Sequence, residues 1–142
     1  MNYKFDIISD FSKIRVCDER LVDAHTGVLM LYSVVDLMSF YYVQHLIESI
    51  GPRLSCPVVL VGTKVDLGDK RRVKKSTALQ LAKQNNFLYF EVSAALDIGV
   101  KECFDCLLRK VLVKKISKEM EQKRFKHSVG KRKDQPRRSS IC

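Results

Sequence analysis

The chain of 142 residues is long enough for one hydrophobic core, and its 46% apolar and 30% charged residues exclude a protein that is disordered throughout. No apolar run reaches the roughly 18 residues of a transmembrane helix, and the five scattered cysteines fit a reducing, intracellular compartment. The formal net charge is +10, and because residues 1–108 hold equal numbers of acidic and basic side chains, the whole excess falls in residues 109–142.

In chain order, short apolar runs alternate with helical patterns. The first run, at residues 3–8, alternates and then turns apolar, which predicts a strand. Three further short apolar runs predict strands buried on both faces of a parallel sheet, at 28–34, 58–61 and 87–92. Apolar residues at helical spacing predict helices at 40–50, 78–82 and 100–112, the first of which stops at Gly51-Pro52. The alternation predicts an α/β fold with a mainly parallel sheet flanked by helices.

The most informative segment joins the apolar run at 58–61 to Thr63-Lys64-Val65-Asp66. A carboxylate at the end of a buried strand can accept hydrogen bonds from both N1–H and the exocyclic amine of guanine, and adenine offers no such pair of donors. In this interpretation Asp66 reads the base, the Lys64 stem lies along it and the Thr63 hydroxyl fixes the loop. The alternative is a strand-to-turn junction in which Lys64 is solvated and Asp66 is a capping residue.

Two other segments match the motifs of a known protein family in their order and in their separation along the chain. A strand pattern at 27–34 leads to Asp36 and a helix start at Ser39, and the run at 87–92 leads to a Ser-Ala-Ala loop. Together with the Thr-Lys-x-Asp motif between them, they make residues 1–113 resemble the Ras superfamily of small GTPases. The resemblance implies GTP or GDP as the ligand, with the Ala94 backbone N–H donating to O6 of guanine. It also implies a pocket for the base made by Thr63, Lys64, Asp66, Ser93, Ala94 and Ala95.

Other parts of the family pattern have no counterpart in this sequence. It contains no G-x-x-x-x-G-K-S/T phosphate loop, and residues 1–8 align with the strand that leads into Asp-x-x-Gly in the family. Where that motif should follow stands Ser9-Asp10-Phe11-Ser12, so that the carboxylate linked to Mg²⁺ and the glycine are both replaced. We therefore expect an incomplete Ras-like P-loop NTPase fold that lacks the first two strands and the phosphate loop. We also expect no catalytic or metal-binding residues, weak or lost nucleotide binding, and no GTP hydrolysis.

The cysteines and histidines predict no further chemistry. Cys103 and Cys106 form a lone C-x-x-C on a predicted helix, which favours packing positions over a metal or redox site. His25, His45 and His127 have no nucleophile or ligand partner at a suitable spacing.

Residues 114–142 are predicted to form a basic extension of the partial domain at 1–113, helical at first and disordered from Lys123 onward, where apolar periodicity ends. Its charge favours attraction to anionic lipids of the cytoplasmic leaflet, with calmodulin binding and simple solvation as the alternatives. Nucleic acid is disfavoured because the segment has one aromatic residue and no recognition fold. Ser139 and Ser140 follow two arginines and form a candidate phosphorylation site. The candidate lipid or calmodulin contacts are Lys114, Lys115, Lys118, Lys123, Arg124, Lys126, Lys131, Arg132 and Lys133, with Val111, Val113, Ile116, Met120 and Phe125 as apolar anchors.

Within the superfamily, three features resemble the Rad, Gem and Rem (RGK) branch: the degenerate Asp-x-x-Gly, the segments at 31–36 and 91–96, and a basic end without a prenylation signal. The Ras-like growth-inhibitor branch is the alternative. The RGK resemblance implies regulation of voltage-gated calcium channels at the inner face of the plasma membrane, with calmodulin, 14-3-3 proteins and anionic lipids as partners. Two hypotheses follow: a signalling regulator linked to guanine nucleotide, or a membrane-bound interaction module that works without nucleotide.

Overall fold

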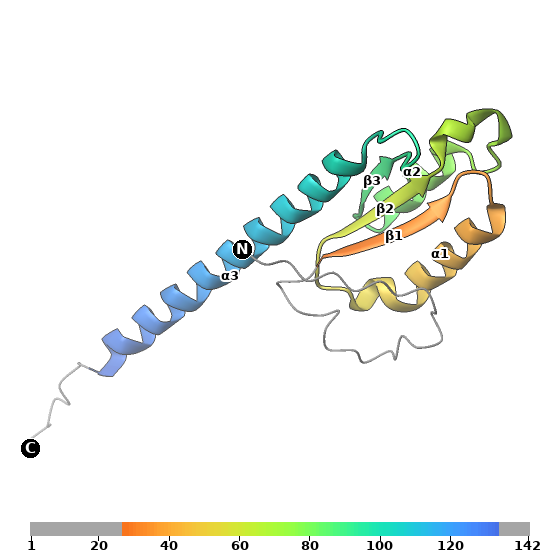
Figure 1. The fold of residues 1–142 in the computed structure, drawn as a ribbon. Coiled ribbons are helices and arrows are strands. Elements are labelled where there is room, and N and C mark those ends of the chain that lie inside the picture. The colour runs from red at the N-terminus through yellow and green to blue at the C-terminus, as the bar shows by residue number, and fades with distance from the viewer. Residues whose placement is uncertain (1–26, 134–142) are drawn as a thin grey trace, which may run out of the picture.

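The computed structural model describes residues 27–133, which form a parallel sheet with helices on both faces (Figure 1). The α/β class and the three strands predicted at 28–34, 58–61 and 87–92 are confirmed, whereas the strand predicted at 3–8 lies outside the described residues. In chain order the elements are β1 (Val28–Ser33), α1 (Leu37–Ile50), the 3-10 turn η3 (Gly51–Arg53), β2 (Val58–Thr63), the 3-10 segment η4 (Val65–Lys70), α2 (Lys75–Gln84), β3 (Leu88–Glu91) and α3 (Val100–Lys133).

The sheet has the order β1-β2-β3, and both strand pairs are parallel. The middle strand, β2, is buried on both faces, which explains its unbroken run of apolar residues from Val58 to Val61. Val28 lies opposite Val58 at the start of β1, and Ser33 lies opposite Thr63 at its end. Among the described strands, β2 is the only neighbour of β1, so that no strand within residues 27–133 pairs with the other edge of β1.

Successive side chains of a strand point to opposite faces, and this alternation divides the apolar core in two. On one face, Tyr32 of β1 and Leu60 of β2 pack with residues of α1 and α2. On the other face, Val59 and Val61 of β2 pack with Cys103 and Leu107 of α3. The sheet therefore lies between α3 on one side and α1 with α2 on the other (Figure 1).

Helix α1 begins directly after a capping residue, Asp36. The side chain of Asp36 accepts hydrogen bonds from the backbone N–H groups of Met38 (3.0 Å) and Ser39 (3.4 Å). These two groups have no partner inside the helix, so that the carboxylate satisfies them. The helix ends where Gly51 and Pro52 begin η3, as the sequence predicts.

Helix α3 is longer than predicted, and the expected disorder from Lys123 onward is wrong as far as Lys133, where the helix ends. Residues 119–126 contain glutamate, methionine, glutamine, lysine and arginine and no glycine or proline, so that intrinsic propensity favours a helix there without apolar periodicity. The helix is continuous across residues 113 and 114, and the division into a domain and a basic extension at that point stays a prediction. Neither α3 nor any other helix within residues 27–133 is apolar enough to cross a lipid bilayer.

Candidate functional site

The carboxyl ends of β2 and β3 lie side by side at one edge of the sheet, because the two strands are parallel neighbours. Ligands of open α/β sheets bind outside such ends. This arrangement brings together Asp66 of η4 and Ser93 of the loop after β3, which are far apart in the sequence. The Ser93 hydroxyl donates a hydrogen bond of 2.6 Å to Asp66 Oδ1. Ser93 is fully buried, whereas Asp66 is exposed. The carboxylate is therefore held by Ser93 on its buried side and is accessible to a ligand on its solvent side.

The turn between β2 and η4 is held by its own backbone and by β1. Lys64 adopts a left-handed conformation (φ 63°, ψ 37°), which is sparsely populated by residues other than glycine. The Thr63 hydroxyl donates a hydrogen bond of 2.9 Å to the Tyr32 carbonyl oxygen of β1. The backbone N–H of Val65 donates to the Val92 carbonyl oxygen. The loop that carries Asp66 is thus tied to both neighbouring strands.

The loop after β3 folds back on itself. Ser93 and Ile98 exchange two backbone hydrogen bonds of 2.9 Å, and Leu96 N–H donates to the Ser93 hydroxyl oxygen (3.2 Å). Ala94 and Ala95 lie at the tip of this loop and are exposed. Their methyl side chains leave the backbone accessible to a flat ligand, as the proposed contact between Ala94 N–H and guanine O6 requires.

A groove of about 580 Å³ joins this edge to α3, within the range of small-molecule sites. Its polar end contains the candidate base-binding residues other than Ser93, which lies beneath it: Thr63, Lys64, Asp66, Ala94 and Ala95. Its other wall is apolar and includes Leu29, Leu31, Val61, Val100 and Phe104. Leu31 is 56% exposed although it lies in the middle of β1.

A polar network on the α1 and α2 face of the sheet, opposite the face that lines the groove, was missed by the sequence analysis. The Arg71 guanidinium, just after η4, donates two hydrogen bonds to the Glu91 carboxylate at the end of β3, of 2.8 and 3.1 Å. The Tyr89 hydroxyl donates to the same carboxylate (2.7 Å) and lies 2.9 Å from the Tyr32 hydroxyl. Burial raises the pKa of Tyr89 far above its ordinary value, and its two hydrogen bonds act in the same direction. The network fixes the far end of η4 to the sheet. In the sequence, the network is indicated only by the opposite charges of Arg71, which follows the Thr-Lys-x-Asp motif, and Glu91, which precedes the Ser-Ala-Ala loop.

His, Cys, Asp and Glu are the side chains that most often bind metals in proteins. Within residues 27–133, no three His, Cys, Asp or Glu side chains converge as a metal site. Cys103 faces the sheet in the apolar core, and burial raises the pKa of its thiol to about 11. Cys103 and Cys106 are not linked by a disulfide. His45 on α1 and His127 on α3 are exposed, and His25 lies outside the described residues.

The basic residues of the predicted extension fall into two groups. Those at 131–133 lie within α3, but their side chains are not described, and Ser139 and Ser140 lie outside the described residues. The others lie on α3 with side chains that are half-exposed at 114 and 115 and exposed beyond: Lys114, Lys115, Lys118, Lys123, Arg124 and Lys126.

Comparison with known proteins agrees with the geometry of the site. Residues 10–113 match the Ras family. The chain is 36% identical over 90 residues to Ras-related protein Rab-13 of Canis lupus familiaris, covering 62% of this chain and 44% of the relative. It is 33% identical over 106 residues to GTP-binding protein Rit2 of Mus musculus (72% and 48%), and 36% identical over 96 residues to Ras-related protein R-Ras of Rattus norvegicus (66% and 44%). The chain spans about half the length of these curated relatives.

Proposed function

Since the chain belongs to the Ras family, we propose that it is a guanine-nucleotide-binding signalling protein whose base pocket lies at the carboxyl ends of β2 and β3. The observation that supports this most directly is the hydrogen bond from Ser93 to Asp66 Oδ1. A carboxylate offers about four acceptor positions, and Ser93 occupies one of them. The remaining positions can accept from N1–H and the exocyclic amine of guanine.

The experiment that tests the base pocket is a titration of the chain with fluorescent GDP. We expect a dissociation constant no better than roughly micromolar, about 8 kcal/mol, because this sequence contains no phosphate loop to bind the phosphates. Asp66→Ala should abolish binding, whereas the matched variant Asp69→Ala should keep it, since Asp69 lies in the same η4 segment but not in the groove. Equal binding by Asp66→Ala and the unchanged chain, or equal competition by ATP and GTP, would contradict the proposal.

A second candidate function is a membrane-bound interaction module that needs no nucleotide. It is favoured by the location of the whole +10 charge in residues 109–142. If attraction is electrostatic, binding to liposomes should require anionic lipid and should weaken as salt shortens the Debye length from about 10 Å at 0.1 M to about 3 Å at 1 M. Asp66→Ala should bind such liposomes as well as the unchanged chain does. Equal binding to neutral and anionic liposomes would contradict this candidate.

At a finer level we propose a regulatory role of the RGK type, at the inner face of the plasma membrane. The support is the sequence pattern at 31–36 and 91–96 together with the basic segment. The relatives reported above are Rab-13, Rit2 and R-Ras, so the assignment to this branch rests on the sequence pattern alone. The proposed partners are calcium-channel subunits, calmodulin and 14-3-3 proteins, the last through phosphorylated Ser139 or Ser140. Binding of the chain to purified channel subunits tests the role. No binding to them with either GDP or GTP present would contradict it.

A further inference from the structure

The second half of α3 extends beyond the sheet and does not pack against it. Val111 is the last α3 residue that packs in the apolar core of the described residues, and every described side chain after Lys115 is exposed. Figure 1 shows the helix continuing well past the sheet. An isolated helix in water is only marginally stable, so a partner surface along this half would stabilise it.

One face of this half is apolar. Val113, Ile116 and Met120 are 62%, 54% and 54% exposed. Because a helix turns by about 100° per residue, the three lie within about 60° of one another around the axis. They form a continuous patch, which we name the α3 patch. Of the five apolar anchors predicted from the sequence, Val111 packs on the sheet instead, and Phe125 lies about 150° from the centre of the patch.

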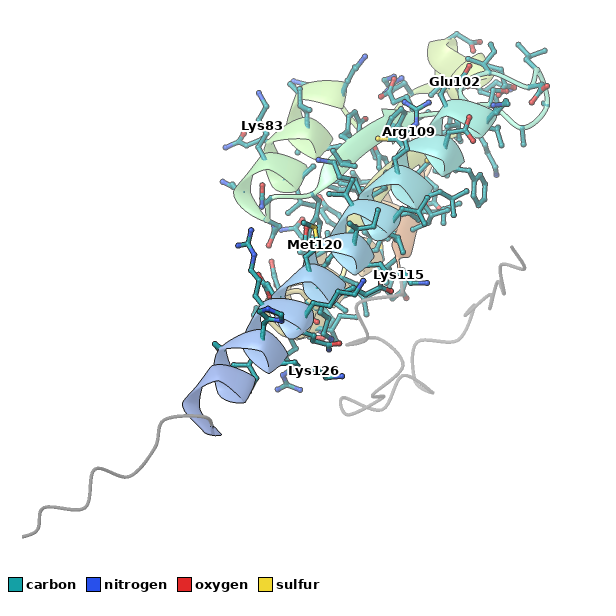
Figure 2. All side chains as sticks on the ribbon, turned by 90° about the vertical axis from the view of Figure 1, so that its left-hand side faces the viewer. Lys83, Glu102, Arg109, Lys115, Met120 and Lys126 are labelled. Atoms are coloured by element: carbon teal, nitrogen blue, oxygen red, sulfur yellow. The ribbon has the colours of Figure 1, made fainter. Side chains whose placement is uncertain are left out.

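Positive charge brackets the α3 patch at both ends. Arg109 precedes it, and Lys123 and Arg124 follow it, all within about 55° of its centre. The nearest carboxylates along the helix, Glu119 and Glu121, lie about 90° or more away. Asp105 lies further back and pairs with Lys101. In Figure 2, α3 runs in front of the sheet, with Met120 on one side of the helix and Lys115 and Lys126 on the other.

We propose that α3 binds an anionic lipid bilayer lengthwise, with Val113, Ile116 and Met120 inserted among the acyl chains and the flanking cations at the phosphate level. The proposal rests on the proposed membrane attachment and specifies how it occurs: through one face of a formed helix, and not through the charge of a flexible tail. A narrow apolar stripe between basic residues is the pattern of a helix that lies in the membrane interface. A second copy of the chain would oppose like charges across the same face, which disfavours self-association there.

The orientation of the domain follows from the helix. The residues that pack on the sheet, Cys103, Leu107 and Val111, lie on the side of α3 away from the α3 patch. The sheet and the groove beside Asp66 would therefore lie on the cytosolic side of the helix, clear of the lipid.

The chain contains no tryptophan, so a single introduced indole reports its own depth. We compare Met120→Trp with Phe125→Trp on vesicles of phosphatidylcholine and phosphatidylserine, with and without brominated acyl chains. Indole emission of the first variant should shift to shorter wavelength and be quenched by bromine, and that of the second should stay as in water. Equal quenching at both positions, or at neither, would overturn the proposal.

Two double variants that remove the same charge distinguish insertion of the α3 patch from general electrostatic attraction to the vesicle. Lys123→Gln with Arg124→Gln removes two cations beside the patch, and Lys118→Gln with Lys126→Gln removes two exposed cations more than about 110° away. The first pair should weaken partitioning into anionic vesicles more than the second, and Met120→Asp should weaken it about tenfold or more. Equal losses would refute insertion through the patch while leaving electrostatic attachment standing. Binding to Ca²⁺-loaded calmodulin together with no vesicle binding would refute both.

Discussion

The hydroxyl groups of Tyr32 on β1 and Tyr89 on β3 meet 2.9 Å apart although β2 lies between their strands. They can meet because Gly62, the β2 residue opposite both Tyr32 and Glu91, has no side chain. A Cβ atom at Gly62 would lie 2.8 Å from the Tyr32 hydroxyl oxygen and 3.1 Å from Cζ of its ring. The glycine therefore leaves room for the polar network that joins β1, β3 and Arg71.

Gly62→Ala should destabilise the fold by about 1–3 kcal/mol, the usual cost of forcing extra volume into a packed core. Tyr32 cannot move aside easily because it is 2% exposed and its ring packs edge-on against Phe40 at 5.1 Å. Urea denaturation measures the change. The control is Gly68→Ala, where a Cβ meets nothing within 4 Å. Equal stability of the two variants would show that the close contact at Gly62 costs nothing.

The Glu91 carboxylate should make stability depend on pH. Burial alone would raise the pKa of Glu91, but hydrogen bonds from Arg71 and Tyr89 outweigh burial and hold this pKa below its ordinary value. Its contribution is then complete above the pKa of the unfolded chain, about 4.3, and is lost as pH falls through the lower pKa of the folded chain. Glu91→Gln should cost about 1–3 kcal/mol at pH 7, and the difference should shrink below about pH 4.3.

Urea denaturation of both proteins between pH 3 and pH 7 measures this difference. Glu119→Gln, at an exposed position on α3, serves as the control and should show a difference near zero throughout. A cost of Glu91→Gln that stays constant down to pH 3 would mean that the ionised carboxylate is not what stabilises the fold.

Local patterns were enough to predict the three described strands and the presence of a helix after each of them. The run at 58–61 is rich in valine and the run at 87–92 is rich in aromatic residues, and both compositions favour strands. Asp36 and Gly51 mark the ends of α1 by their own chemistry. The Thr-Lys-x-Asp motif likewise predicted the edge at which Asp66 and Ser93 meet, because parallel neighbours present their carboxyl ends together. Occupation of that edge by guanine stays a prediction.

Features that depend on register between strands could not be predicted from one sequence. The Tyr32–Tyr89 contact requires that Tyr32 lie opposite Gly62 and Tyr89 opposite Leu60, and nothing local specifies either pairing. The exposure of Leu31 likewise depends on which neighbours β1 has. The length of α3 was underestimated because charged residues of high helix propensity carry no apolar period.

Leu31→Thr should reduce self-association of the chain and leave its stability within about 0.5 kcal/mol. Leu31 is exposed on the strand whose outer edge carries no described neighbour, and an exposed apolar edge is an aggregation hazard. Threonine is β-branched, and this shape suits a strand. Light scattering during concentration measures the effect, with the fully buried Leu60→Thr as the destabilised control. Undiminished scattering by Leu31→Thr would place the associating surface elsewhere.

Asp66→Asn should change the preferred base from guanine to xanthine. Guanine presents two donors, N1–H and the exocyclic amine, to the Asp66 carboxylate, whereas xanthine presents N1–H and a carbonyl oxygen. An amide side chain offers one acceptor and one donor and so matches xanthine, while it leaves one guanine donor facing another donor. The Ser93 hydroxyl can still donate to the amide oxygen at Oδ1, so that the loop keeps its support.

Competition between xanthine and guanine nucleoside diphosphates for the site, on both proteins, measures the change. An unpaired donor in a desolvated contact costs about 1–3 kcal/mol, and we therefore expect the ratio of the two affinities to reverse by tenfold or more. Ser93→Ala separates support from recognition: it should weaken both nucleotides to the same degree, because Ser93 lies beneath Asp66 and leaves the base-facing acceptors unchanged. If Asp66→Asn weakened both diphosphates equally, Asp66 would support the loop without reading the base.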